Sequence, residues 1–218
     1  MTKEIKMVEE MLSLQDNVNS TVDKDWKLKN REWYRAGWVE CGELMGSLPY
    51  KWWKHQEPDL KNARIELVDI WHFILSKCIE TNVCADIITE HWRPFTSNSN
   101  ELELIDLLAF NLLKMRYEGG SIIPVIEYFS IICDSINISL EDVYLFYIGK
   151  ATLNNFRQNN GYKEGTYVKM WKLPQYNSAG EDNYFLTSIL ENFKGAVPDN
   201  LSEQIYDKLK YYYNRIDK

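Results

Sequence analysis

Apolar residues recur every three or four positions along most of this chain, which is the spacing of a helix with one buried face. The alternation of apolar and polar residues that marks a half-buried strand is hard to find. The pattern therefore indicates an all-α fold. It predicts helices over residues 3–21, 30–47, 60–82, 84–92, 101–118, 121–136, 140–160, 183–194 and 201–216.

Local residues mark the ends of several predicted helices. Ser139 and Asp142 have the spacing of a capping box at the start of the helix over 140–160. Gly119 and Gly161 stand where two helices are expected to finish, and glycine commonly closes a last helical turn. These signals support the periodicity with an independent kind of information.

Two segments are predicted to be loops, 94–100 (PFTSNSN) and 173–182 (LPQYNSAGED). Neither is long enough to predict a linker between domains, and the chain shows no internal repeat. We therefore expect one all-α domain over residues 1–218. Its C-terminal helical region, 183–218, is expected to wrap around the rest or to pack on a second subunit.

The composition excludes some classes of protein. The 218 residues carry a net charge of −7, which argues against a nucleic-acid polymer as the main partner. The N-terminal stretch contains acids and lacks the cleavage site of a signal peptide. No apolar run reaches the roughly 18 residues that a membrane span needs. We expect a globular protein that does not insert into a membrane.

The cysteines indicate a reducing compartment. Cys41, Cys78, Cys84 and Cys133 show no CxxC spacing, and most of them have apolar neighbours in the sequence. We interpret them as reduced core residues rather than as metal ligands or disulfide partners. Together with the preceding features, they predict a cytoplasmic protein.

Two pairs of acids are the most informative polar feature. Glu40 with Glu43, and Glu66 with Asp69, are spaced i, i+3, so each pair shares one helix face. Such pairs repel each other by about 0.2–0.5 kcal/mol, so helix stability does not explain them. A hard divalent cation such as Mg²⁺ does, because it prefers oxygen ligands and negative charge. The alternative is a pair of solvated acidic stripes.

An aromatic segment lies between the two acidic pairs. Trp52 and Trp53 are flanked by Lys51 and Lys54, which suggests stacking on a base with cations close to phosphate. The alternative is that both tryptophans bury the corner between two helices. His72 and His55 could be metal ligands, but a single histidine on an apolar helix is more often a core residue.

A basic face is predicted on the helix over 140–160. Lys150, Asn154 and Arg157 are spaced i, i+4 and i+7, and Lys163 and Lys169 follow in a glycine-bounded loop. These side chains suit phosphate, since arginine offers a planar fork, lysine a point charge and asparagine a neutral donor. The alternative is a solvated face paired with nearby acids. With the acids and aromatics, the set fits metal-assisted cleavage of a nucleotide.

Four segments carry a resemblance to a known family. They are LQDNVN (14–19), ECGEL followed by YKWWK (40–44 and 50–54), RIELVDIWHF (64–73) and YIGKATLNNFRQNNGYKEGTYVKMW (147–171). In order and approximate spacing they match, from about residue 10 to 172, the all-α dimeric deoxyuridine triphosphatases (dUTPases). That family is related to the MazG-like nucleotide pyrophosphohydrolases. The resemblance implies a helical bundle of the all-α NTP pyrophosphatase type that forms a homodimer.

The resemblance also implies an activity and a set of roles. It implies a hydrolase that converts dUTP and dUDP to dUMP with Mg²⁺, by water attack on the β-phosphorus, and releases pyrophosphate or phosphate. Glu40, the residue expected to orient or deprotonate that water, would be one of four metal ligands. The roles it implies are metal binding by Glu40, Glu43, Glu66 and Asp69, phosphate binding by Lys150, Asn154, Arg157, Lys163 and Lys169, and base binding by Gln15, Asn19 and Trp53.

The chain also departs from the family pattern. The match fades over about 83–138 and after 172, and Gly42 and Gly46 add flexibility to the first acidic helix. The alternatives are a dCTPase or a broader MazG-like NTP pyrophosphohydrolase, and a dUTPase that also binds a regulatory protein. A protein-binding module would need neither charged set. Bacterial and phage sources, with a bacterial or infected host cytoplasm, both fit.

Overall fold

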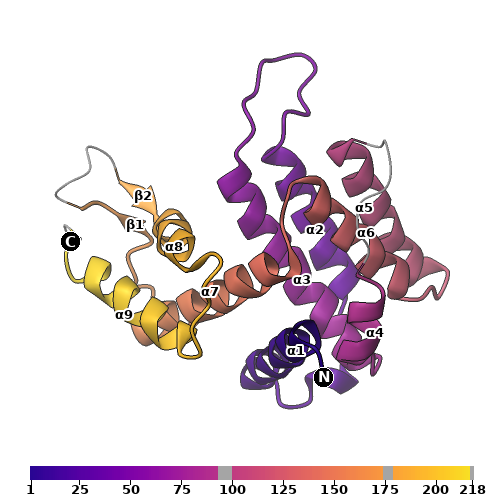
Figure 1. Ribbon diagram of the computed structural model, residues 1–218, viewed down its shortest axis with the longest axis horizontal. Helices are drawn as coiled ribbons and strands as arrows, with labels where there is room; N and C mark the ends of the chain where they lie inside the picture. Colours follow the sequence, from indigo (N-terminus) through magenta and orange to yellow (C-terminus); the bar gives the residue numbers. More distant parts are fainter. Residues whose placement is uncertain (93–99, 174–178, 217–218) are drawn as a thin grey trace. The chain divides into compact units, whose positions relative to one another are not determined.

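The computed structural model describes residues 1–92, 100–173 and 179–216. Helices form most of this part of the chain, which confirms the prediction of an all-α fold (Figure 1). The chain divides into two compact units, Met1–Tyr144 and Leu145–Lys218, and each is described by itself. The prediction of a single domain stays a prediction.

The first unit is built around one long apolar helix. Its elements in chain order are α1 (Lys3–Val22), the short 3₁₀ helix η1 (Trp26–Leu28), α2 (Trp33–Gly46), α3 (Leu60–Glu80), α4 (Ala85–Glu90), α5 (Glu101–Tyr117), α6 (Ile123–Ser135) and the first residues of α7 (Leu140–Asn159). Helix α3 contacts α1, α2 and α6, and α2 also contacts α5. Trp71 of α3 is fully buried and stacks on Phe129 of α6 at 4.7 Å between ring centroids. Burial on several sides explains why α3 reads as apolar around most of its circumference.

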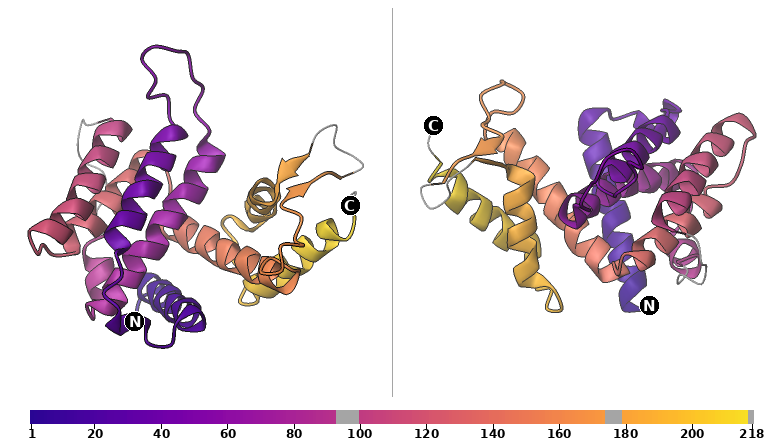
Figure 2. Two further views of the ribbon diagram at one scale, coloured as in Figure 1. Left: turned by 180° about the vertical axis from the view of Figure 1, so that it is seen from behind. Right: turned by 90° about the horizontal axis from the view of Figure 1, so that it is seen from above.

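Helices α2 and α3 lie side by side, and the views in Figures 1 and 2 agree on this. A Cβ atom added at Gly37 of α2 would lie 3.2 Å from Leu112 of α5, so the absence of a side chain there lets α2 approach α5 closely.

The capping box is confirmed at the start of α7. There Asp142 donates its backbone N–H to Ser139 Oγ at 3.1 Å and accepts the Ser139 backbone N–H at 2.9 Å.

The connection from α2 to α3, residues 47–59, extends beyond the ends of both helices (Figure 1). Its base is closed by a hydrogen bond of 2.8 Å from the Asp59 backbone N–H to the Ser47 carbonyl oxygen. Trp52 is 91% exposed and Trp53 58% exposed. The alternative that these tryptophans bury a helix corner is therefore wrong.

The second unit collects aromatic side chains around the end of α7. After α7 it contains β1 (Met170–Trp171), β2 (Gly180–Glu181), α8 (Asp182–Leu190), the 3₁₀ helix η2 (Glu191–Phe193) and α9 (Leu201–Tyr213). The strands pair antiparallel, with Met170 opposite Glu181 and Trp171 opposite Gly180. Buried Phe156 makes ring contacts with Tyr167, Trp171, Tyr206 and Tyr213, which form the core of this unit.

The two loops predicted from the sequence can be compared with the structure only in part. Residues 94–99 of the first predicted loop and residues 174–178 of the second lie outside the described residues. The prediction of a loop over 173–182 is wrong at its end, because β2 occupies 180–181 and α8 begins at Asp182. Strands of two residues are too short to show an alternating pattern. In the described part of the chain, no single helix has both the length and the apolar character of a membrane span.

Candidate active site

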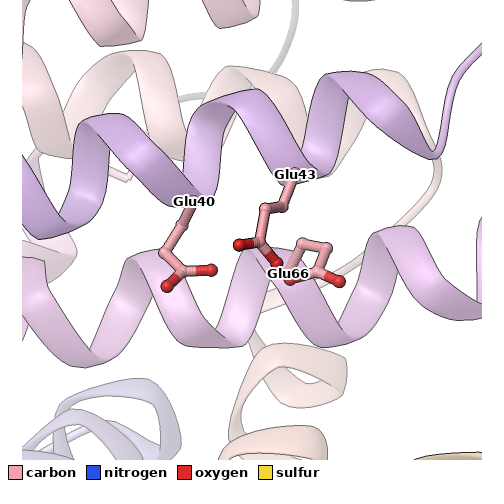
Figure 3. A group of neighbouring side chains, drawn as sticks. All are labelled: Glu40, Glu43 and Glu66. Atoms are coloured by element: carbon pink, nitrogen blue, oxygen red, sulfur yellow. The ribbon is translucent and has the colours of Figure 1, made fainter.

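Three of the four predicted acids come together between two neighbouring helices. Glu40 and Glu43 point from α2 toward Glu66 on α3 (Figure 3), and one carboxylate oxygen of each lies within 4.8 Å of the others. Asp69 follows Glu66 by one helical turn and does not belong to this group among the described residues. The i, i+3 spacing places Glu40 and Glu43 on one face of α2, and the packing of α2 on α3 brings that face to Glu66.

The three carboxylates differ in exposure. Glu66 is 8% exposed, Glu40 is half-buried and Glu43 faces solvent. Burial of Glu66 contradicts the alternative of a solvated stripe on α3. A carboxylate in such a place needs donors, and Asn62, one turn earlier on α3, donates Nδ2 to Glu66 Oε1 at 2.9 Å. The same Nδ2 group also lies 2.8 Å from Ser47 Oγ, at the end of α2.

Asn62 and Ser47 are residues to which the sequence assigned no function. The only signal for Asn62 was its position four residues before Glu66, on the same polar stripe of α3. Nothing in the sequence marked Ser47, since its contact with Asn62 depends on how the connection between the helices closes. Both residues support Glu66 from the side that faces this connection.

The donor set of the cluster suits a hard cation. All three groups offer carboxylate oxygens, and for bonds of about 2.1 Å the ligands of an octahedral Mg²⁺ are about 3.0 Å apart when adjacent and about 4.2 Å apart when opposite. The three oxygens lie within 4.8 Å of one another, so the side chains would have to draw closer together to bind one ion. Neighbouring Cys41 offers no thiolate, because burial and the charge of Glu40 raise its pKa to about 12.

Gln15 and Asn19, the residues predicted to read a base, lie buried where α1 meets α3. Gln15 Nε2 donates to Asn19 Oδ1 at 3.0 Å, and Asn19 Nδ2 donates to Ser76 Oγ at 2.9 Å. His72 Nδ1 lies 2.7 Å from Gln15 Oε1. His72 is thus part of this amide network. His55, in the exposed connection after α2, instead contacts Glu57 at 2.7 Å.

Trp53, the predicted stacking residue, belongs to the connection between α2 and α3. Its ring makes edge contacts with Tyr50 and Trp52 at 5.9 and 5.6 Å between centroids. Edge contacts of this kind leave much of the indole exposed, in agreement with its exposure of 58%. An exposed indole is available to a flat ligand.

The predicted phosphate-binding residues belong to the second unit, and some already have acidic partners. Arg157 donates Nε and Nη2 to the two oxygens of Asp182, each at 2.8 Å, and Nη1 to Asn154 Oδ1 at 3.1 Å. Lys169 lies 3.2 Å from Glu181, in an exposed pair. Lys150 is buried, whereas Lys163 is exposed. The alternative of a basic face paired with acids therefore holds for part of Arg157 and for Lys169.

Asp182 is the centre of this second cluster. It is fully buried at the start of α8, and it accepts a further hydrogen bond from the Tyr167 hydroxyl at 2.8 Å. Burial and the charge of Asp182 raise the pKa of Tyr167, so the phenol stays protonated. Burial alone would lower the pKa of Arg157, but the hydrogen bond and charge of Asp182 raise it. No sequence pattern had indicated this role of Asp182.

Comparison with models of known families finds a match for this chain. The sequence matches the model of a family described as dUTPase over residues 7–162. This span contains both acidic pairs, both amides, Trp53 and the first three predicted phosphate-binding residues, and it ends just before Lys163. Among curated proteins, none matches the chain.

Proposed function

Since the chain belongs to the all-α dUTPase family and is a dUTP diphosphatase, we propose that Mg²⁺ is its cofactor and that Glu40, Glu43 and Glu66 bind the ion. The observation that carries this proposal is the approach of three carboxylates to within 4.8 Å of one another. Like charges so close together destabilise the fold unless a cation offsets them. Asp69, one turn further along α3, is proposed as the fourth acidic ligand.

The acids then have distinct tasks in the hydrolysis of dUTP to dUMP and pyrophosphate. A bound Mg²⁺ ion supplies positive charge to the phosphate oxygens. Glu40 orients the attacking water and accepts its proton. The oxygen of that water forms a bond to the β-phosphorus, and the bond from the β-phosphorus to the oxygen it shares with the α-phosphorus breaks. Because attack at this atom needs no γ-phosphate, dUDP is also a substrate and yields dUMP and phosphate.

The cationic residues of the second unit are proposed to hold the phosphate chain. Lys150 and Arg157 supply positive charge, and Asn154 supplies a neutral donor. Asp182 occupies the edge of the Arg157 guanidinium with Nε and Nη2, and Nη1 uses one hydrogen toward Asn154 Oδ1, so the second hydrogen of Nη1 would meet a phosphate oxygen. Lys163 and Lys169 are proposed as further phosphate-binding residues in the loop after α7.

The base is proposed to contact Gln15, Asn19 and Trp53. Side-chain amides offer both a donor and an acceptor, as the imide edge of uracil requires, and the exposed indole of Trp53 offers a stacking surface. The family resemblance supports a homodimer in which each subunit helps to complete the site of the other. Free cysteines, three of them buried, fit a reducing cytoplasm.

A nucleotide panel tests this function. The protein is incubated with dUTP, dUDP and the four canonical dNTPs in the presence of Mg²⁺, and the products are separated by chromatography. We expect dUMP from dUTP and dUDP, and no dUMP after addition of EDTA. Equal turnover of all four canonical dNTPs would show a broad pyrophosphohydrolase, and preferred turnover of dCTP would show a dCTPase.

A further inference from the structure

We propose that Ser76 is a positioning residue: its hydroxyl fixes the orientation of the Asn19 and Gln15 amides and thereby makes the enzyme prefer uracil to cytosine. Ser76 is fully buried on α3, outside every role assigned above. The inference rests on the proposed function, because it takes these two amides to be the groups that meet the base. Its support is the direction of the hydrogen bonds between α1 and α3.

Ser76 determines which atom is the donor in each hydrogen bond of this network. Its Oγ donates to the backbone carbonyl of His72 at 2.8 Å. A hydroxyl has one hydrogen and a carbonyl can only accept, so Ser76 Oγ must act as an acceptor toward its other neighbour. That neighbour, 2.9 Å away, is the amide of Asn19. The atom of Asn19 that faces Ser76 must therefore be Nδ2.

The remaining assignments follow one after another. With Nδ2 toward Ser76, Asn19 turns Oδ1 toward Gln15, whose nearest atom at 3.0 Å must then be the donor Nε2. Gln15 in turn presents Oε1 to His72 Nδ1 at 2.7 Å, so Nδ1 carries the hydrogen of the imidazole. The hydrogen bonds run from the side chain of His72 through Gln15, Asn19 and Ser76 back to the His72 backbone. One hydroxyl thus determines both amides and a histidine tautomer.

Neither amide can turn over alone. If the Asn19 amide were rotated by 180°, its Nδ2 donor would face the Nε2 donor of Gln15. Its Oδ1 acceptor would then face Ser76 Oγ, whose hydrogen is already bonded to the His72 carbonyl. Water cannot repair these contacts, because Gln15 is 4% and Asn19 9% exposed. Reversal of the whole network requires two amide rotations and a proton shift in His72. The reversed network would have three hydrogen bonds instead of four, because Ser76 Oγ would donate to Asn19 and lose its hydrogen bond to the His72 carbonyl.

The orientation of an amide selects a base because uracil and cytosine differ at two adjacent atoms. Uracil presents a carbonyl acceptor at C4 and a donor at N3, whereas cytosine presents an amino donor and an acceptor there. Asn19 uses one hydrogen of Nδ2 and one lone pair of Oδ1 in the network, and each atom has one more. The second hydrogen of Nδ2 and the second lone pair of Oδ1 therefore keep fixed positions. An amide in this orientation that pairs donor with acceptor on one base would pair donor with donor and acceptor with acceptor on the other.

The test compares dUTP and dCTP as substrates in the same preparations. For Ser76→Ala, we expect the ratio of kcat/KM for dUTP to that for dCTP to fall by about tenfold, a factor that one hydrogen bond can supply. Ser76→Thr keeps a hydroxyl and should restore most of the ratio. Because both substrates meet the same folded fraction, partial unfolding cancels. Ser130→Ala is the matched control, since Ser130 is also fully buried and donates to a backbone carbonyl at 2.8 Å, on α6.

Two results would overturn the inference. One is an unchanged ratio in Ser76→Ala, and the other is an equal fall in Ser130→Ala. If Ser76→Ala does not fold, ¹⁵N NMR of the unaltered enzyme at pH 8 decides, because the network requires the His72 hydrogen on Nδ1, and a hydrogen on Nε2 would overturn it. If the unaltered enzyme does not prefer dUTP, the proposed function fails instead, which this design separates from failure at Ser76.

Discussion

The carboxylate of Glu66 is held in place by a side chain of its own helix. Asn62 donates to it at 2.9 Å and is itself tied to Ser47, where α2 ends. Glu43, on the facing helix, is exposed and free to adjust its rotamer. One acid of the cluster is thus preorganised while another adapts, a combination that lets a site close around a small cation.

Replacement of Asn62 by alanine tests this support. Groups that hold a metal ligand in place typically change metal affinity by about 10- to 100-fold when removed. We expect Asn62→Ala to raise the Mg²⁺ concentration for half-maximal dUTP turnover by such a factor and to leave the fold intact. Asn111→Ala is the control, because Asn111 donates to the Leu107 carbonyl on α5, outside the cluster. An Mg²⁺ dependence unchanged by Asn62→Ala would contradict the role.

Individual residues were predictable to different degrees. The acids were found because i, i+3 pairs of like charge are unfavourable without a ligand. Ser47 and Asp182 could not be found, since their roles arise from contacts with Asn62 and Arg157, 15 and 25 residues away. Sequence spacing reports which residues share a helix face, but it does not report which distant residues meet across a loop.

At the scale of elements, helices were predicted well and the short hairpin was not. Helix α3 was expected over 60–82 and spans Leu60–Glu80, because a long apolar pattern marks it. The pair β1–β2 depends on packing instead: Trp171 of β1 lies against Phe185 of α8, at 5.3 Å between ring centroids. Contacts of this kind between distant aromatic residues produce no periodic pattern of apolar positions in the sequence.

The contact between α7 and α8 predicts an asymmetry between two neighbouring acids. Asp182→Ala leaves the Arg157 guanidinium, with a side chain only 11% exposed, without its buried partner. Breaking such a pair typically costs about 3–5 kcal/mol. We expect this loss in the free energy of unfolding by urea, measured on the full chain.

The matched control is the preceding residue. Glu181 pairs with Lys169 at 3.2 Å, with both side chains about half exposed, so Glu181→Ala should cost about 0–1 kcal/mol. Equal losses in the two variants would show that the Arg157–Asp182 pair does not stabilise the second unit.

At the scale of the whole molecule, the residues with proposed roles are divided between the two units. The acids, the amides and Trp53 belong to Met1–Tyr144, and the cationic residues belong to Leu145–Lys218. The sequence did not predict this division, because the boundary falls inside α7, where the helical pattern continues and contains no proline. The family match also spans the boundary and ends at residue 162.

We propose a dependence of dUTP hydrolysis on Mg²⁺ bound by the cluster of Glu40, Glu43 and Glu66. Its most direct test is the rate of dUMP release from dUTP as Mg²⁺ is titrated, for the unaltered enzyme, Glu43→Gln and the control Glu103→Gln, an exposed glutamate of α5. We expect saturable Mg²⁺ dependence in the enzyme and the control, and a loss of at least about 100-fold in folded Glu43→Gln, since metal ions supply several kcal/mol of transition-state stabilisation. Full turnover without Mg²⁺, or full activity of Glu43→Gln, would contradict it.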